Sequence, residues 1–287
     1  GSDAGIDYQL YDGVTPVGSA VAGTGSAISF GSQTAAATYT VIATNTTTGC
    51  VNNMNGNAVV AIDPLPVAYT VTGGGTYCAG GAGFSVGLSN SDIGIDYQLY
   101  NGVTPVGAAL AGTGAALDFG FHTAAGTYTV IATNTVTGCT NTMSSSAVIV
   151  VNPLPAMYNV IGGGSYCAGG TGVNISLDWS DAGIDYQLYD GVTMIGAPLA
   201  GVNDTLDFGM HTAAGTYTIL ATNAVTGCTN YQSGSATVVI IPTVVPSVSI
   251  WASTADTICQ GTWVMFTATP VNGGGSPSFQ WKVNGVD

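Results

Sequence analysis

The chain has almost no positive charge. Its 287 residues include one lysine and no arginine, against fifteen acidic residues that are all aspartate, and the formal net charge is −14. Charged residues make up only 6% of the chain, compared with about a quarter of an average soluble domain. Because so few cations are available to meet a phosphate, the composition argues against nucleic acid and anionic lipid as partners.

Charged residues that favour helices are also scarce. Glu and Arg are missing and Lys occurs once, whereas Thr, Val, Tyr and Gly are abundant. No apolar run approaches the length of a membrane span, so we expect no membrane insertion. The 43 glycines lack the triplet period of collagen and are expected to mark turns. Since hydrophobic residues still make up 46% of the chain, the composition predicts an all-β fold with packed cores.

One stretch of the sequence occurs three times. It reads TAAATYTVIATNTTTGC up to Cys50, TAAGTYTVIATNTVTGC up to Cys139 and TAAGTYTILATNAVTGC up to Cys228, so the copies are 89 residues apart. Each copy has a Gly/Ala turn followed by a run that alternates large and small residues, which indicates a half-buried strand leading into a hairpin. A fixed period of this length predicts an array of similar domains.

The period and the proline-containing links divide the chain into four domains. We expect repeat 1 at 1–66 without its N-terminal part, repeat 2 at 67–155, repeat 3 at 156–242 and the start of a different module at 243–287. The links contain Pro64-Leu65-Pro66, Pro153-Leu154-Pro155 and Pro242. Prolines hold φ fixed, so these links should be stiff spacers. Both ends interrupt a domain, and we therefore expect the chain to be part of a longer protein.

Within repeat 2 the hydrophobic pattern predicts seven strands. Ile95, Tyr97 and Leu99 alternate with polar residues and should share one buried face. Asn101-Gly102 is a strong hairpin signal. Seven short strands in 89 residues predict an immunoglobulin-like antiparallel β-sandwich. The expected strands cover 68–72, 84–89, 94–100, 103–109, 115–119, 126–134 and 140–151.

Two sets of aromatic residues are expected at marked positions of such a fold. A tyrosine opens the sixth strand of every repeat, where the immunoglobulin fold often carries a corner tyrosine; these are Tyr39, Tyr128 and Tyr217. In the last module we expect the tryptophans in the core, with Trp281 at the usual third-strand position; these are Trp251, Trp263 and Trp281.

The order of motifs also resembles a known family. GGG-[TS]-YCAGG, GIDYQLY-[DN]-GVT, GTYTVIATN and TGC together resemble tandem repeats of very large secreted surface proteins of the Bacteroidetes type. Those include gliding and surface adhesins exported by the type IX system, which carry immunoglobulin-like and PKD-like modules. The resemblance covers the whole chain and implies an extracellular, cell-surface location. It also implies O-glycosylation candidates at Thr205 and Thr257, each within an Asp-Thr-Leu/Ile motif, for which plain surface turns are the alternative.

Cysteines of an exported protein should be oxidised, and no metal-type CxxC pair is present. Pairing within a repeat would join Cys78 to Cys139 and Cys167 to Cys228. In an immunoglobulin-like topology, however, Cys78 precedes the second strand and Cys139 follows the sixth. The two would then lie at opposite poles of the sandwich, well beyond the limit of about 7 Å between Cα atoms.

We therefore favour a disulfide staple across a domain junction, which joins Cys78 to Cys228. Cys167 would pair beyond Asp287, and Cys50 and Cys259 would also have partners outside this sequence. Sequential pairing, such as Cys50 with Cys78, is the third arrangement.

Two sets of residues are candidates for binding a ligand. Aspartates precede or open the third strand of each repeat, where hard carboxylate ligands would suit Ca²⁺ and where aspartate is equally an ordinary turn residue; the Ca²⁺ candidates are Asp92, Asp96, Asp181 and Asp185. Aromatic residues on the outer face are compatible with a sugar platform, although strand tyrosines commonly pack; these are Tyr100, Tyr189 and Trp179.

No pattern indicates an active site. His122 and His211 are the only histidines, and repeat 1 has Gln33 at the matching position, so a turn or strand-end role is expected. The glycine runs lack the lysine of a phosphate-binding loop. We expect no enzyme and, apart from the calcium candidate, no cofactor.

Together these observations favour the stalk of a secreted bacterial adhesin or surface filament, in which neighbouring repeats of the same chain are the main partners. A carbohydrate-binding repeat array that contacts surface glycans is the alternative. A third hypothesis is a subunit that assembles with like subunits through exposed strand edges.

Overall fold

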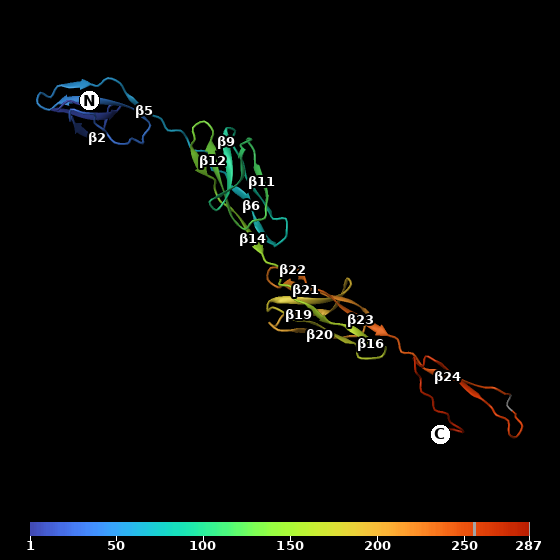
Figure 1. Cartoon of the computed structure of the whole chain (residues 1–287). Helices are drawn as coiled ribbons and strands as arrows, with labels where there is room; N and C mark the ends of the chain where they lie inside the picture. The colour runs from blue at the N-terminus through green and yellow to red at the C-terminus, as the bar shows by residue number, and fades with distance from the viewer. Residues whose placement is uncertain (255–256, 287) are drawn as a thin grey trace. The chain divides into compact units, whose positions relative to one another are not determined.

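The computed structural model describes residues 1–254 and 257–286. Its regular structure consists of strands, and none of the described residues belongs to a helix that could cross a membrane. Strands pair only with strands of the same sequence repeat, so each repeat has its own sheets (Figure 1). By internal contacts the chain divides into two compact units, Gly1–Val151 and Asn152–Asp287.

Repeat 2 is a sandwich of two sheets. The first sheet has three strands in the order β11-β8-β6, namely β11 (Leu117–His122), β8 (Phe84–Leu88) and β6 (Val71–Gly73). The second sheet has the order β10-β9-β12-β14-β7, namely β10 (Thr104–Ala111), β9 (Ile95–Asn101), β12 (Gly126–Asn134), β14 (Ala147–Asn152) and β7 (Gly75–Cys78). A short strand, β13 (Thr140–Thr142), forms a hairpin with β12.

Repeat 3 has the same arrangement. Its three-stranded sheet contains β15 (Val160–Gly162), β17 (Val173–Leu177) and β20 (Leu206–His211). Its larger sheet contains β16 (Gly164–Cys167), β23 (Ala236–Ile241), β21 (Gly215–Asn223), β18 (Ile184–Asp190) and β19 (Thr193–Ala200), with β22 (Thr229–Tyr231) paired to β21. β16 runs parallel to β23, with Gly164 opposite Val238 and Cys167 opposite Ile241.

In repeat 2 the first predicted strand, 68–72, corresponds to β6, and it is followed by β7, which was not predicted and belongs to the other sheet. In repeat 2 the chain leaves β6 and enters β7 through Gly73, Gly74 and Gly75, all with positive φ. A Cβ atom on Gly74 would overlap the backbone of Val148, so only glycine permits this crossing. The last predicted strand, 140–151, is likewise interrupted, because 143–146 separates β13 from β14 and Ser145 has φ 66°.

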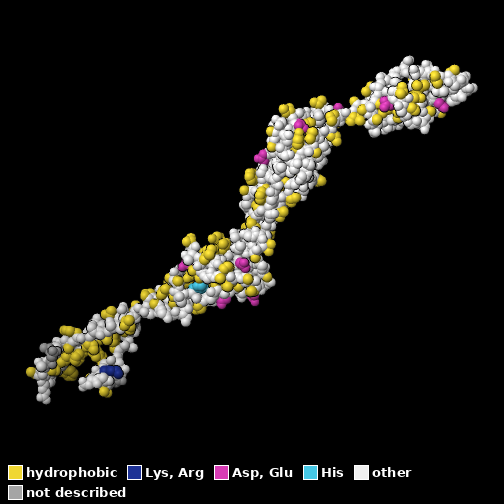
Figure 2. Space-filling model, turned by 180° about the vertical axis from the view of Figure 1, so that it is seen from behind, with side chains coloured by type: hydrophobic (Ala, Val, Ile, Leu, Met, Phe, Trp, Pro, Cys, Tyr) yellow, Lys and Arg dark blue, Asp and Glu magenta, His cyan; other side chains and the backbone are white. Residues whose placement is uncertain are grey.

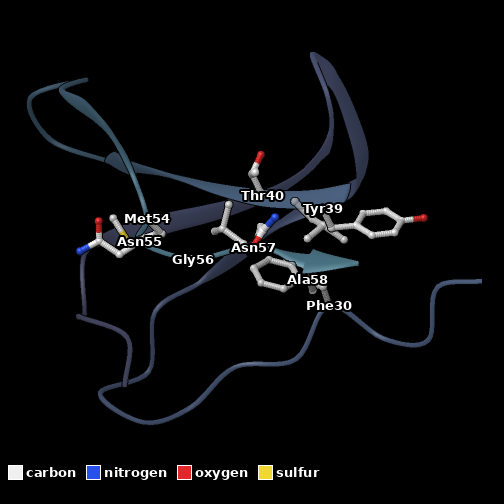
Figure 3. Close-up of a pocket in the computed structure, with 10 residues that line it drawn as sticks. Phe30, Tyr39, Thr40, Met54, Asn55, Gly56, Asn57 and Ala58 are labelled. Carbon is white, nitrogen blue, oxygen red and sulfur yellow. The ribbon is translucent and has the colours of Figure 1, made fainter. Parts of the chain in front are cut away.

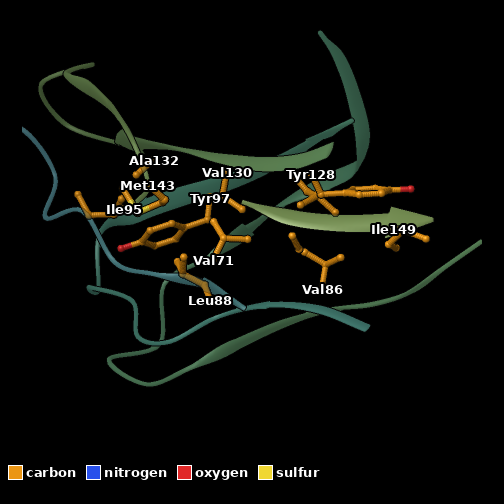
Figure 4. Packing of buried hydrophobic residues seen from close by; sticks show 12 residues of the cluster. Val71, Val86, Leu88, Ile95, Tyr97, Tyr128, Val130, Ala132, Met143 and Ile149 are labelled. Atoms are coloured by element: carbon orange, nitrogen blue, oxygen red, sulfur yellow. The ribbon is translucent and has the colours of Figure 1, made fainter. Parts of the chain in front are cut away.

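The core of repeat 2 lies between its two sheets (Figure 4). Ile95, Tyr97 and Leu99 are at most 7% exposed, so the predicted alternation of β9 is confirmed. Val86 and Leu88 face them from β8, and both are essentially buried. Burying such side chains contributes roughly 1.5–3 kcal/mol each, and this accounts for the strict period of two along the strands.

The tyrosine at the start of the sixth predicted strand makes the same contact in every repeat. Its hydroxyl donates a hydrogen bond to the carbonyl oxygen four residues upstream: Tyr39 to Ala35 at 3.0 Å, Tyr128 to Ala124 at 2.9 Å and Tyr217 to Ala213 at 3.0 Å. This is the corner expected from the sequence. Together with the strand order it shows tandem immunoglobulin-like β-sandwich repeats.

Repeat 1 has one sheet among the described residues. It consists of β1 (Ile6–Asp12), β2 (Thr15–Ala22), β3 (Ala37–Asn45), β4 (Val51–Asn53) and β5 (Ala58–Val60). Residues 28–33, which correspond to β11 of repeat 2, form no strand here.

The last module forms a single two-stranded ladder in the described part of the chain, β24 (Ser247–Ala252) with β25 (Phe266–Val271). The expectation of buried tryptophans is wrong: Trp251, Trp263 and Trp281 are 65%, 94% and 50% exposed. One ladder presents no opposing sheet to cover them, and Trp281 contacts only the Phe266 ring among the ring contacts described, at 6.3 Å between centroids.

Candidate functional site

The six cysteines fall into two groups. Cys78 and Cys228 are disulfide-bonded, and Cys228 is fully buried. The other four are free thiols, namely Cys50, Cys139, Cys167 and Cys259. The within-repeat bridges Cys78–Cys139 and Cys167–Cys228 are therefore not formed, and neither is Cys50–Cys78. The junction disulfide between Cys78 and Cys228 stays a prediction.

The sheet register explains why the within-repeat bridge fails in repeat 3. Gly215, the first residue of β21, lies opposite Val238 of β23, whereas Cys167, the last residue of β16, lies opposite Ile241. Cys167 is therefore about three residues beyond the N-terminal end of β21. Cys228 follows the opposite end of the same strand, beyond Asn223. At about 3.3 Å per residue the two cysteines lie on the order of 30 Å apart, against a limit of about 7 Å for a disulfide.

The calcium candidates are engaged with tyrosines and strand neighbours. Asp92 Oδ1 accepts a hydrogen bond of 2.7 Å from the Tyr69 hydroxyl, and the Asp92 N–H donates to the Tyr97 hydroxyl at 2.9 Å. Asp96 lies on β9 opposite Thr133. No group of three or more His, Cys, Asp or Glu side chains suited to a metal occurs within residues 1–254 and 257–286.

Repeat 3 shows the same contacts. Tyr158 donates to Asp181 Oδ1 at 2.8 Å and the Asp181 N–H donates to the Tyr186 hydroxyl at 3.0 Å, while Asp185 lies on β18. The hydrogen bond to the carboxylate, followed by desolvation, raises the pKa of Tyr158 to about 12. The aspartates before the third strand thus hold tyrosine side chains in both complete repeats. Calcium binding stays a prediction.

The aromatic residues considered for sugar binding do not form one platform. Tyr100 and Tyr189 are half-buried and lie between cross-strand neighbours, which for Tyr189 are Thr218 and Met194. Trp179 is 43% exposed and precedes β18, whereas Tyr189 lies near the other end of that strand. Five residues of strand separate Ile184 from Tyr189, or roughly 17 Å. Sugar binding therefore remains a prediction without a shared surface.

Both histidines end a strand and contact the corner tyrosine. His122 ends β11 and its ring centroid lies 5.1 Å from that of Tyr128; His211 ends β20 and lies 5.1 Å from Tyr217. His211 Nε2 lies 3.1 Å from the Phe208 carbonyl oxygen. These contacts are those of packing residues at the strand ends.

The surface carries isolated charges. On the face seen in Figure 2 the carboxylates lie singly among uncharged side chains. Thr205 and Thr257, the glycosylation candidates, are both exposed, as a modified residue must be. Asp256, which precedes Thr257 in its motif, lies outside the described residues.

One open groove lies on repeat 1 (Figure 3). Its volume is about 360 Å³. The apolar lining comes from β1, β3, β5, Met54 and the loop containing Phe30, and Asn55, Gly56 and Asn57 also line the groove. Val41 and Met54 are half-buried here, whereas their counterparts Val130 and Met143 in repeat 2 are 0% and 3% exposed.

Sequence reasoning missed two polar contacts that recur between repeats. The first is the pair formed by Tyr69 and Asp92, repeated as Tyr158 and Asp181. The second is the glutamine of β9, Gln98, whose Nε2 donates to three backbone carbonyl oxygens. Both sets recur at the 89-residue period, and that recurrence was the available signal.

No family model and no curated protein matches the chain. Similar solved structures include three N-terminal domains of the Highly Immunogenic Outer Capsid protein of bacteriophage RB49, at 14% identity, 83% of this chain, 89% of that chain and a TM-score of 0.32. Fibronectin(III)-like modules of Clostridium thermocellum CbhA are 13% identical, with 60% of this chain and 95% of that chain covered and a TM-score of 0.30. The full ectodomain (Ig1–Ig3) of mouse nectin-like molecule 4 is 14% identical, with 72% of this chain and 75% of that chain covered and a TM-score of 0.28. Because these TM-scores are low, the assignment of the fold rests on the strand order and register of the chain itself.

Proposed function

We propose that the chain is part of the stalk of a secreted bacterial cell-surface adhesin or filament, and that its repeats provide reach and resistance to force. The observation that carries the proposal is the way each complete repeat pairs its last strand with the second of its strands. In repeat 3 the second strand, β16, is hydrogen-bonded in parallel to the final strand, β23.

The parallel arrangement determines how a pulling force acts. Tension on the two ends of the repeat draws β16 toward its N-terminus and β23 toward its C-terminus. Because the strands are parallel neighbours, the ladder is loaded in shear and its hydrogen bonds must fail together. An antiparallel terminal pair would instead open one bond at a time. The order β14-β7 shows that repeat 2 also pairs its second and final strands.

A junction disulfide between Cys78 and Cys228 would add a covalent limit to extension. Support comes from both residues being disulfide-bonded and from the other four cysteines being free thiols. The bridge would join the first cysteine of one repeat to the sixth-strand hairpin of the next. Such a bond would pass tension directly from residue 78 to residue 228, so β16, which lies between them, would bear load only when the bond is reduced.

Location and chemistry are consistent with this role. A disulfide and immunoglobulin-like repeats suit an extracellular protein, and the motif resemblance described above is to secreted surface adhesins exported by the type IX system. The proposal includes no catalytic step and no cofactor, with neighbouring repeats as the principal partners.

Single-molecule force spectroscopy on the full chain under reducing conditions tests the proposal, because an intact bond between Cys78 and Cys228 would shield β16 from the tension. In the variant Ala168→Pro the N–H that donates to the Ile241 carbonyl oxygen at 2.8 Å is removed at the end of the β16 ladder. We expect a lower unfolding force for repeat 3 alone. Ala168→Ser keeps the N–H and should behave as the wild type, and repeat 2 is an internal control. Equal forces in all three proteins would contradict a load-bearing ladder.

The second candidate is a carbohydrate-binding array, favoured only by the 43% exposure of Trp179. Glycan-array binding that is lost in Trp179→Ala would support it. The stalk proposal expects no such binding.

A further inference from the structure

A hollow lies on repeat 2, at the pole where strands of both sheets end. It is lined by the end of β9, the start of β10, the end of β11 and the start of β12, and its volume is about 430 Å³. Among the described residues, the side chains that line it carry no fixed charge. A ligand held here would therefore be recognised by hydrogen bonds and apolar contact rather than by ion pairing.

A β-bulge turns an aromatic ring outward beside this hollow. Leu117 and Phe119 of β11 pack against the core of repeat 2, so a period of two would also bury Phe121. The register of β11 with β8 shifts between Asp118 and Phe121, and Gly120 there has φ 85°. Such a bulge changes the direction of the side chains that follow it. Phe121 is 70% exposed as a result, and it lines the hollow.

The next residue, His122, also lines the hollow, and one of its ring nitrogens has no partner. Its ring centroid lies 5.1 Å from that of Tyr128. Nε2 is buried and makes no hydrogen bond, and no other buried side-chain nitrogen or oxygen within residues 1–254 and 257–286 is left in this way. In repeat 3 the counterpart His211 has the Phe208 carbonyl oxygen at 3.1 Å from its Nε2. A buried polar atom without a partner is unfavourable, so a ligand that supplies one gains affinity.

Two hydroxyl groups at the hollow are also available for binding. The side-chain oxygens of Thr104 and Thr123 make no hydrogen bond with any residue that the structure describes. A hydroxyl donates one hydrogen bond and accepts two, and an imidazole nitrogen donates or accepts according to the tautomer. A ligand with several hydroxyl groups can therefore satisfy these atoms whichever way the protons lie. An anion is disfavoured by the net charge of −14 and would meet no cationic side chain in the described lining.

We propose that this hollow of repeat 2 is a binding site for a neutral saccharide. The apolar face of one sugar ring packs on the exposed ring of Phe121. The hydroxyl groups of the sugar form hydrogen bonds with Thr104, Thr123 and His122. An apolar wall with a few convergent polar groups is the usual composition of a small-molecule site. The inference goes beyond the proposed stalk, does not depend on it, and uses none of the aromatic residues that the sequence indicated for sugar binding.

Repeat 3 supplies the variant for the test. Met210 stands there in place of Phe121 and is 54% exposed, so Phe121→Met should fold like the wild type while it lacks a flat ring. The full chain is applied to an array of neutral glycans built from hexose and N-acetylhexosamine units. We expect binding by the wild type, and binding weaker by about tenfold in Phe121→Met. Trp179→Ala should bind like the wild type, which separates this site from a carbohydrate-binding array that uses Trp179. Binding that is lost in Trp179→Ala and kept in Phe121→Met would overturn the inference.

The two histidines of the chain allow the site to be identified in solution. In a nuclear magnetic resonance titration with the neutral glycan that binds best on the array, the ring signals of His122 should shift and those of His211 should not. In Phe121→Met the same shift should require about tenfold more glycan. Absence of binding to every neutral glycan, equal binding by wild type and Phe121→Met, or a shift at His211 alone would each overturn the proposal. Tighter binding of acidic than of neutral glycans would overturn it as well.

Discussion

The hydroxyl of Tyr158 lies 2.8 Å from Asp181 Oδ1 and donates a hydrogen bond to it. The bond ties the segment before β15 to the loop that connects the two sheets of repeat 3. Tyr69 and Asp92 make the same contact in repeat 2 at 2.7 Å. An aspartate that looked like an ion ligand in the sequence therefore has a structural partner from the start of its own repeat.

This contact predicts a dependence of stability on alkaline pH. Asp181 raises the pKa of Tyr158 from 10.0 to about 12 in the folded chain. The stabilisation is therefore complete below the pKa of an unfolded tyrosine, near 10, and is lost as pH rises through about 12. Spectroscopic titration of tyrosinate should show several tyrosines of raised pKa, and their number should fall by one in Tyr158→Phe. In Asp181→Asn the pKa of Tyr158 should fall toward 10, and an unchanged value would contradict this account.

The corner tyrosine should contribute measurably to stability. Tyr128→Phe removes the donor to the Ala124 carbonyl oxygen while keeping the buried ring, which is 1% exposed. We expect the free energy of unfolding of repeat 2 to fall by about 1–2 kcal/mol, measured by hydrogen exchange of its core amides. Tyr100→Phe on the outer face of the same sheet is the control, with a change within about 0.5 kcal/mol. Equal losses in the two variants would argue against a special role of the corner.

Gln98 should hold the bulge between β9 and β10. Its Nε2 donates to the carbonyl oxygens of Leu99, Val106 and Gly107 at 2.9, 3.1 and 3.3 Å, where the register of β10 shifts. Gln98→Ala should cost about 1–2 kcal/mol in urea unfolding. Gln98→Glu should cost more than the alanine variant, because a carboxylate would face three carbonyl oxygens without a donor. A glutamate variant as stable as the wild type would show that the amide donors are unimportant.

The cysteines yield a direct chemical prediction. Alkylation without reductant should label Cys50, Cys139, Cys167 and Cys259 but neither Cys78 nor Cys228. Peptide mapping under non-reducing conditions should then recover Cys78 linked to Cys228. Cys228→Ser should expose a new thiol at Cys78, whereas Cys139→Ser should not. A linked Cys78–Cys139 peptide would contradict the junction disulfide.

Much of the fold could be predicted from local pattern. The alternation in β9 placed Ile95, Tyr97 and Leu99 on the buried face, and the position of Tyr128 predicted the corner. Both rest on interactions within a few residues of each other or on a simple period. The sequence pattern did not show that the chain changes sheet between β6 and β7, because that crossing depends on the approach of Gly74 to the backbone of Val148.

The candidate sites were harder to predict from the sequence than the fold. Asp92 was read with Asp96, its neighbour in sequence, yet its hydrogen-bond partner is Tyr69, at a separation of 23 residues. The tryptophans of the last module were read as core residues, yet Trp263 is 94% exposed, because burial requires an opposing sheet as well as an apolar side chain.

The sequence by itself determined that this protein is a periodic all-β chain, poor in cations, with one face of each strand apolar, since these properties follow from composition and spacing. Only the tertiary structure decided which polar groups meet. The Tyr158–Asp181 contact, the parallel β16–β23 ladder and the open groove of repeat 1 all depend on how distant strands are brought together. Such contacts arise when two sheets pack around a shared core. Residues far apart in the sequence become neighbours only in the closed sandwich, so no local sequence pattern predicts these contacts.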